Sequence, residues 1–303
     1  MSEGLGERKV TAKGLAYLSI VYVVWGSTYL AIRLGVREGS GFPPFALGAV
    51  RVLVAGAALM GWAALRGMKL RLTRRECWTL AIAGLLMWPG ANGLVNWAEQ
   101  RADSSYAALL VGALPIWTAV IDAAWRRQRP TLRLLAFLLA GFAGVALLTV
   151  PRLAVAEGAD FVTIFMLMVA PITWAVGSLL QIHRPVTVQP VVSAAYLHLF
   201  GGLGFVLLFL ATGEPMPTPT WQAWIACGYL IVFGSIGAFT AFVRTLRLLP
   251  TPIAMTYAYV NPVVAVILGW LLLREPVSSI ILAGMALILF GVWGIFHERA
   301  RSC

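Results

Sequence analysis

Long apolar stretches separated by short polar connectors run through the whole chain. Each stretch holds about 20 mainly apolar residues, the length that an α-helix needs to cross a bilayer. The connectors contain glycine, proline and charged residues, as in EGSGFPP (38–44) and RRQRPT (126–131). The pattern predicts an all-α integral membrane protein with ten transmembrane helices, at about residues 14–34, 44–66, 75–98, 103–125, 131–150, 160–182, 188–212, 221–246, 251–273 and 278–297.

The composition excludes a soluble globular protein. Hydrophobic residues make up 60% of the chain and charged residues 12%, and the mean hydropathy is +0.85. The polar start, MSEGLGERKVTAKG, lacks the small-residue cleavage site of a signal peptide, so we expect the first apolar stretch to be retained as a helix. The cysteines Cys77, Cys227 and Cys303 lack metal or redox spacing, which predicts neither a disulfide framework nor a metal site.

The excess of basic residues predicts the orientation of the chain. The 23 Lys and Arg against 12 Asp and Glu give a net charge of +11, but the basic residues lie in connectors, as the positive-inside rule requires, rather than in a nucleic-acid site. With a cytoplasmic N-terminus, five arginines fall on the outer side (Arg33, Arg37, Arg101, Arg152 and Arg274), Arg51 lies within a span, and the remaining 17 are cytoplasmic. Both termini are therefore expected in the cytoplasm.

The two halves of the chain resemble each other. Aligning YAALLVGALPIWTAVIDAAWRRQRP (106–130) with IAMTYAYVNPVVAVILGWLLLREP (253–276) pairs Pro115 with Pro262, and similar alignments pair Trp25 with Trp174 and Gly144 with Gly291. Each half contains five predicted helices. Because five is odd, the second half enters the membrane from the opposite side, as in the inverted repeats of secondary transporters. The predicted repeats are residues 1–150 and 151–303.

The order of these motifs resembles a known family. The Trp-Gly of the first span, the ALGAVRVLVAGAAL segment with its arginine, the prolines within spans and the Arg-Glu-Pro after the ninth span are similar to the EamA-type drug/metabolite transporter superfamily. Length and aromatic content are most like the YddG-type exporters of amino acids. The resemblance covers nearly the whole chain and implies a ten-helix metabolite exporter of the bacterial inner membrane.

Prolines within the spans indicate where helices are interrupted. A proline lacks the amide N–H and frees a carbonyl, which is tolerated in a membrane where protein or a wet cavity satisfies it. Transporters bind substrate at such interruptions. The alternative is a kink that serves packing alone. The candidate hinges are Pro89, Pro115, Pro171 and Pro262.

Polar and aromatic side chains within the spans are candidates for a substrate cavity. Trp88, Asn92 and Asn96 recur at helical spacing and predict one inward face, because asparagine against lipid is costly. For asparagine, a hydrogen bond between helices is an equal alternative to substrate binding. For tryptophan, packing between helices is an equal alternative. The full set of candidate substrate-binding residues is Tyr22, Trp25, Trp88, Asn92, Asn96, Trp117, Trp174, Ser178, Tyr257 and Asn261.

Charged residues inside the spans are few. Arg51 lies about 10 Å into the second span, at about 1.5 Å per residue, and we interpret it as a structural charge that snorkels or pairs with Glu38 or Glu99. The alternative is that it binds a substrate carboxylate. No acid occupies the middle of a span, so coupling of transport to protons is not expected.

The favoured function is export of amino acids by alternating access. Amino acids with apolar or aromatic side chains would suit a cavity lined by aromatic residues. One alternative is an exchanger of sugar phosphates or nucleotide sugars, which needs several cavity cations. The other is an integral-membrane enzyme, but His183, His198 and His297 are scattered and no catalytic or metal motif is present. We expect no cofactor, no metal and no nucleic-acid partner. The expected partners are a small-molecule substrate and the lipid bilayer, and no oligomeric state is predicted.

Overall fold

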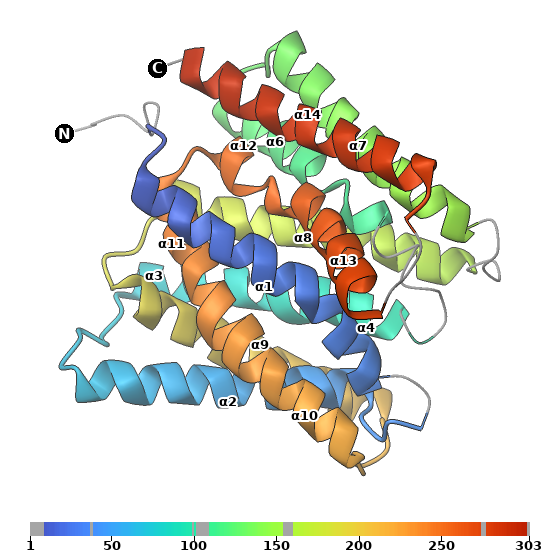
Figure 1. Cartoon of the computed structure of the whole chain (residues 1–303). Coiled ribbons are helices and arrows are strands. Elements are labelled where there is room, and N and C mark those ends of the chain that lie inside the picture. The colour runs from blue at the N-terminus through green and yellow to red at the C-terminus, as the bar shows by residue number, and fades with distance from the viewer. Residues whose placement is uncertain are drawn as a thin grey trace.

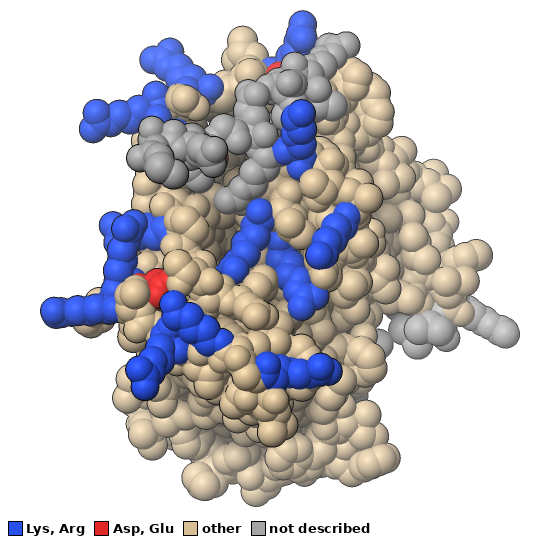
Figure 2. Space-filling view, turned by 90° about the vertical axis from the view of Figure 1, so that its left-hand side faces the viewer, with Lys and Arg blue, Asp and Glu red and all other residues tan. Residues whose placement is uncertain are grey.

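The computed structural model describes residues 9–36, 39–98, 100, 109–153, 160–273 and 277–301. All regular elements in these ranges are helices, and α1 begins on the same side of the molecule on which α14 ends (Figure 1). That side carries many Lys and Arg side chains and few acidic ones (Figure 2). The main helices are α1 (Ala12–Val36), α2 (Pro44–Leu65), α3 (Arg74–Met87), α4 (Leu94–Ala98), α6 (Leu114–Arg126), α7 (Leu132–Leu153), α8 (Phe161–His183), α9 (Pro190–Thr212), α10 (Trp221–Tyr229), α11 (Thr240–Leu248), α12 (Thr251–Ala254), α13 (Tyr257–Leu273) and α14 (Ser279–Arg301).

Nine helical stretches within the described ranges are long and apolar enough to cross a membrane. They coincide with the second to the tenth predicted spans, usually to within a few residues. The first predicted span, 14–34, coincides with the 25-residue helix α1. Several side chains of α1 lie outside the described part of the structure, so its crossing, and with it the full number of ten, remains a prediction.

Side-chain caps explain where several helices begin. Thr73 accepts a hydrogen bond from the amide of Glu76, and the Glu76 carboxylate accepts one from the amide of Thr73, so α3 begins with a capping box. The side chains of Asp160 and Thr220 cap α8 and α10 by accepting a hydrogen bond from the amides of Thr163 and Ala223, without the reciprocal bond. The amide groups at the start of α2 donate instead to Glu214, which lies in the connector after α9. A distant carboxylate therefore caps this helix.

Two spans change from α-helical to π-helical hydrogen bonding near their middle. The segment η1 (Trp88–Gly93) lies between α3 and α4, and η2 (Leu230–Phe239) lies between α10 and α11. In η1 the cause is Pro89, which cannot donate to the carbonyl four residues before it. The η2 segment contains Gly234 and Gly237 in place of a proline. Such turns leave backbone carbonyls for other partners, and Thr173 donates to the Gly90 carbonyl at 2.7 Å.

The other candidate hinge prolines occupy different positions in their helices. Pro115 is the second residue of α6, which begins at Leu114 directly after a two-residue turn. Pro171 and Pro262 lie inside the continuous helices α8 and α13. In the ninth span the interruption lies at Met255 and Thr256, between α12 and α13, and therefore precedes Pro262.

Glycines allow the closest contacts between helices. The helices α7 and α14 lie side by side (Figure 1) and touch through their backbones. A Cβ atom added at Gly291 of α14 would lie 2.6 Å from the amide nitrogen of Gly141 in α7, and one at Gly144 would lie 2.7 Å from the carbonyl oxygen of Gly284. Small residues at these positions are what permits such packing in a membrane.

Candidate functional site

A central cavity lies between helices from both halves of the chain. Its volume is about 110 Å³, which at roughly 10–15 Å³ for each water is room for several waters or a small organic molecule. Helices α1, α2, α6, α8 and α13 and the segment η1 contribute to its wall. The lining residues are Trp25, Thr28, Ile32, Arg51, Trp88, Ala91, Asn92, Val95, Val111, Leu114, Ala170, Pro171, Trp174, Tyr257 and Asn261.

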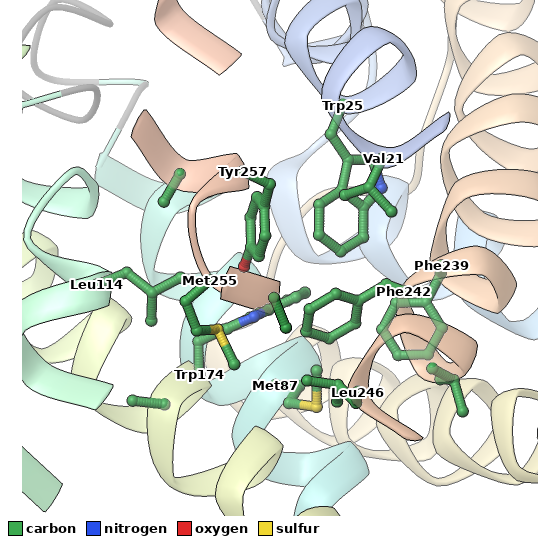
Figure 3. Packing of buried hydrophobic residues seen from close by; sticks show 14 of the residues in the cluster. Val21, Trp25, Met87, Leu114, Trp174, Phe239, Phe242, Leu246, Met255 and Tyr257 are labelled. Carbon is green, nitrogen blue, oxygen red and sulfur yellow. The ribbon is translucent and has the colours of Figure 1, made fainter. Parts of the chain in front are cut away.

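Aromatic rings from four spans meet at one end of this cavity. We call Trp25, Trp174, Phe239, Phe242 and Tyr257 the aromatic cluster. Figure 3 shows these rings converging from separate helices. The ring of Trp25 lies 5.6 Å from that of Trp174, 5.1 Å from that of Phe242 and 4.9 Å from that of Tyr257, centroid to centroid. Most of these pairs are edge-on or tilted, which are the arrangements that aromatic quadrupoles favour.

Three side-chain hydrogen bonds join α1 to elements of the second half of the chain. The hydroxyl groups of Tyr22 and Thr256 lie 2.6 Å apart and join α1 to the turn before α13. Further along, Arg244 of α11 donates to the hydroxyl of Tyr17 at 2.8 Å. The indole N–H of Trp25 donates to the Gly234 carbonyl of η2 at 3.0 Å. Helix α1 is therefore held against the elements that follow α10.

The wall also contains a buried cation. The side chain of Arg51 is 6% exposed, its Nε donates to the hydroxyl of Ser235 at 2.9 Å, and its guanidinium carbon lies 5.2 Å from the centre of the Trp88 ring. The sequence-based interpretation paired Arg51 with Glu38 or Glu99, and both acids lie outside the described residues. Among the described acids, none forms an ion pair with Arg51.

Several polar atoms of the wall lack hydrogen-bond partners. The indole N–H groups of Trp88 and Trp174 and the amide oxygen of Asn261 are buried, and no described residue pairs with them. Leaving a buried polar group unpaired costs free energy.

The structure places six of the ten candidate substrate-binding residues in the cavity wall: Trp25, Trp88, Asn92, Trp174, Tyr257 and Asn261. Four lie elsewhere. The hydroxyl of Tyr22 contacts Thr256 below the aromatic cluster, and the amide of Asn96 donates to the Pro44 carbonyl at 3.4 Å. Trp117 is half-buried on α6, and Ser178 is fully buried within α8. Of the candidate hinges, only Pro171 lines the cavity.

Sequence reasoning missed Phe239 and Phe242, which complete the aromatic cluster. Both are fully buried, and Phe239 also lies 5.0 Å from Trp88, centroid to centroid. The signal that could have found them is Ser235, which lies four residues before Phe239 and seven before Phe242, so that helical spacing places both rings near the face of a buried polar residue.

A second cavity of about 140 Å³ lies among the ends of α6, α7, α12 and α14. Two acids line it. Asp122 contacts Arg126 at 2.9 Å and His183 at 2.7 Å, which joins α6 to α8, and Glu298 accepts a hydrogen bond from Thr131 at 2.8 Å. No group of three or more His, Cys, Asp or Glu within the described ranges is arranged to hold a metal ion. The central cavity is therefore the better candidate for a binding site.

Comparison with protein families gives two matches within this one chain. Residues 12–150 and residues 161–297 each match the EamA-like transporter family. The two matched segments together cover most of the chain, and their boundary at 150–161 lies close to the boundary predicted between the two halves.

Two individual relatives match about nine tenths of this chain, and a third matches less than half of it. The "uncharacterized inner membrane transporter YedA" of Escherichia coli (strain K12) is 33% identical over 279 residues, 91% of this chain and 88% of YedA. The "uncharacterized transporter YoaV" of Bacillus subtilis (strain 168) is 23% identical over 90% of this chain and 93% of YoaV. A "probable terminal-alkyne amino-acid exporter" of Streptantibioticus cattleyicolor is 27% identical over 46% of each chain. One solved crystal structure shares the fold, with a TM-score of 0.81 at 21% identity over 96% of this chain and 99% of the other.

Proposed function

This chain belongs to the EamA-like transporter family and is a multi-pass transporter of the inner membrane, and we propose that it exports amino acids or related small metabolites by alternating access. The observation that carries the proposal is the central cavity. Its wall combines α1, α2, η1 and α6 from the first family match with α8 and α13 from the second. A site shared between two bundles is the arrangement in which relative movement of the bundles exposes one substrate to each side in turn.

The contacts between helices support an inverted repeat. Helix α1 packs on α11 and α13, and its proposed equivalent α8 packs on α3 and α6. The third span of each half contains a π-helical segment. The carbonyl of Gly90 in η1 accepts from Thr173 of the second half, and that of Gly234 in η2 accepts from Trp25 of the first half. Each proposed half therefore satisfies the interrupted helix of the other.

The proposed substrates are amino acids with apolar or aromatic side chains. Rings of Trp25, Trp88, Trp174 and Tyr257 offer apolar surface, while Asn92 and Asn261 offer polar groups beside it. Sites for small molecules commonly combine an apolar wall with a few polar groups. The relative named a probable amino-acid exporter supports the same class of substrate.

We further propose that both termini and the connectors 66–75 and 126–133 face the cytoplasm. The support is the basic side of the molecule (Figure 2), because Lys and Arg are retained on the cytoplasmic side of membranes. In this orientation the aromatic cluster closes the cavity toward the cytoplasm.

This orientation predicts a labelling pattern. In a variant with Cys77, Cys227 and Cys303 replaced by serine, single cysteines at Lys69 and Gln128 should resist a membrane-impermeant maleimide in intact cells and react after lysis. Met216 is 78% exposed in the connector on the opposite side, so a cysteine there should react in intact cells and serves as the matched control. Labelling of Lys69→Cys and Gln128→Cys in intact cells, with protection of Met216→Cys, would reverse the proposed orientation.

The transport function is tested by flux. Purified protein in liposomes loaded with radiolabelled amino acids should release at least one apolar or aromatic amino acid about tenfold faster than protein-free liposomes. Aspartate and a hexose phosphate serve as comparison substrates. Release of the hexose phosphate without release of any amino acid would replace the proposed substrate class, because it is the outcome that a sugar-phosphate exchanger gives.

A further inference from the structure

The arginine in the cavity wall has unused hydrogen-bonding capacity. A guanidinium has five N–H donors, and within the described part of the chain the one hydrogen bond of Arg51 is from Nε to Ser235. A buried arginine with a purely structural role is expected to spend its terminal nitrogens on carbonyls or on a carboxylate. Here these nitrogens belong to a residue that lines the central cavity.

The contacts that Arg51 does make hold its guanidinium in place. Ser235 fixes Nε, and the face of the Trp88 ring lies against the guanidinium at 5.2 Å. Gly234 leaves the space that this requires, because a Cβ at that position would lie 3.1 Å from one terminal nitrogen of Arg51. A preorganised planar fork of this kind matches the two oxygens of a carboxylate.

No described residue of the wall balances the charge of Arg51. No acidic residue is among the described residues that line the cavity. The described acids are engaged elsewhere: Glu76 with Thr73 and Thr187, Asp122 with Arg126 and His183, Asp160 with the amide of Thr163, Glu214 with the start of α2, and Glu298 with Thr131. A buried cation without a counter-charge is expensive, and an anionic ligand removes that cost.

We infer that Arg51 binds the carboxylate of the transported molecule, an assignment that rests on the transport function proposed above. The substrate class is then a small carboxylate that carries an apolar group, with the carboxylate at Arg51 and the apolar group against Trp25, Trp174 and Tyr257. Arg51 therefore acts on the substrate directly, and the structural charge predicted from the sequence becomes a specificity-determining residue.

The same geometry predicts that the amino group of the substrate contributes less to binding than its carboxylate. Among the described residues of the wall an ammonium group meets no carboxylate, only neutral polar side chains such as that of Asn92. A hydrogen bond to a neutral group contributes less than a pair of opposite charges. Removing the amino group of a substrate is therefore expected to weaken binding less than neutralising its carboxylate.

Binding of three matched compounds to the purified full-length protein tests the assignment. The compounds are L-phenylalanine, 3-phenylpropanoate, which lacks the amino group, and L-phenylalaninamide, which lacks the carboxylate. Binding is followed by quenching of tryptophan fluorescence, because Trp25, Trp88 and Trp174 line the cavity. The two carboxylates should bind at least about tenfold more tightly than the amide.

Substitution of Arg51 should remove this preference. In Arg51→Gln the carboxylates and the amide should bind equally within about threefold, and Arg51→Lys should give an intermediate ratio because a lysine keeps the charge and loses the fork. Arg247→Gln is the matched control. Arg247 is partly buried and donates to the Val188 carbonyl and the Ser193 hydroxyl away from the cavity. Its removal should therefore leave the wild-type ratio of carboxylate to amide affinity. If Arg51→Gln does not fold, the ratio of carboxylate to amide affinity in Arg51→Lys is compared with the wild-type ratio, and an unchanged ratio contradicts the assignment.

The assignment is overturned if the wild type binds the amide as tightly as the acids, if Arg51→Gln keeps the preference, or if neither carboxylate binds. These outcomes leave any measured amino-acid flux standing. Conversely, Arg51-dependent binding of 3-phenylpropanoate together with no flux of any amino acid would retain the carboxylate site and overturn the proposed amino-acid export. The two proposals can therefore fail separately.

Discussion

Replacing Trp174 with alanine is expected to reduce transport at least about tenfold while the protein remains in the membrane. The indole of Trp174 contacts Trp25 at 5.6 Å, Phe242 at 5.9 Å and Trp88 at 6.3 Å between ring centroids. It therefore belongs both to the cavity wall and to the aromatic cluster. Its loss leaves a void between the aromatic cluster and the cavity. A substrate that is positioned less closely is expected to be transported more slowly, with a smaller change in affinity. Flux from proteoliposomes measures the effect.

The equivalent change at Trp25 should alter selectivity as well as rate. Trp25 lies at the same wall but also donates to the Gly234 carbonyl, and removing its ring enlarges the pocket for bulkier side chains. A pocket wall discriminates by size at roughly 10-fold to 200-fold for a methylene group. Trp293→Ala is the control, because Trp293 is 57% exposed on the outer surface of α14. Wild-type rate and selectivity in both cavity variants would place the substrate site elsewhere.

Replacing Gly291 with leucine is expected to destabilise the protein by about 3 kcal/mol. A Cβ at this position would lie 2.6 Å from the Gly141 amide nitrogen and 2.8 Å from the Phe137 carbonyl oxygen. Both neighbours are backbone atoms, so they cannot rotate away and α7 must separate from α14. Thermal unfolding in detergent measures the loss.

Gly61→Leu provides the matched comparison for this substitution. Gly61 also lies inside a predicted span, but a Cβ there would meet nothing within 4 Å. The same chemical change should therefore leave the melting temperature nearly unchanged. Equal melting temperatures for the two variants would show that the contact between α7 and α14 contributes little to stability.

Hydrophobic periodicity and length were sufficient to predict the second to the tenth spans, because a helix that crosses a bilayer must satisfy its own backbone and present apolar side chains along its whole length. The boundaries of α2, α9 and the combined α10, η2 and α11 agree with the prediction to within two residues. Asn92 and Tyr257 in the cavity wall were also found, because a polar or amphipathic group inside a span has few other places to go.

The rest of the site depended on information that no local pattern carries. Helical spacing places Asn96 on the face of Trp88 and Asn92, but η1 changes the register between them, and Asn96 donates to Pro44 instead. Pro262 was expected to interrupt its helix, yet the turn falls at Met255 and Thr256 because a membrane helix tolerates an internal proline. The hydrogen-bond partner of Arg51 is Ser235, which is 184 residues away in the chain.

The π-helical segments have a consequence for the comparison of related chains. An α-helical turn takes 3.6 residues, and a π-helical turn accommodates more, so deleting one residue from η2 allows a span of almost the same length with regular hydrogen bonds. Because the wider turns absorb the extra residue, the side chains on either side of such a deletion keep nearly the same faces of the helix. A one-residue gap in this span, in an alignment of homologous transporters, is therefore compatible with the same cavity wall and should not be closed as an alignment error.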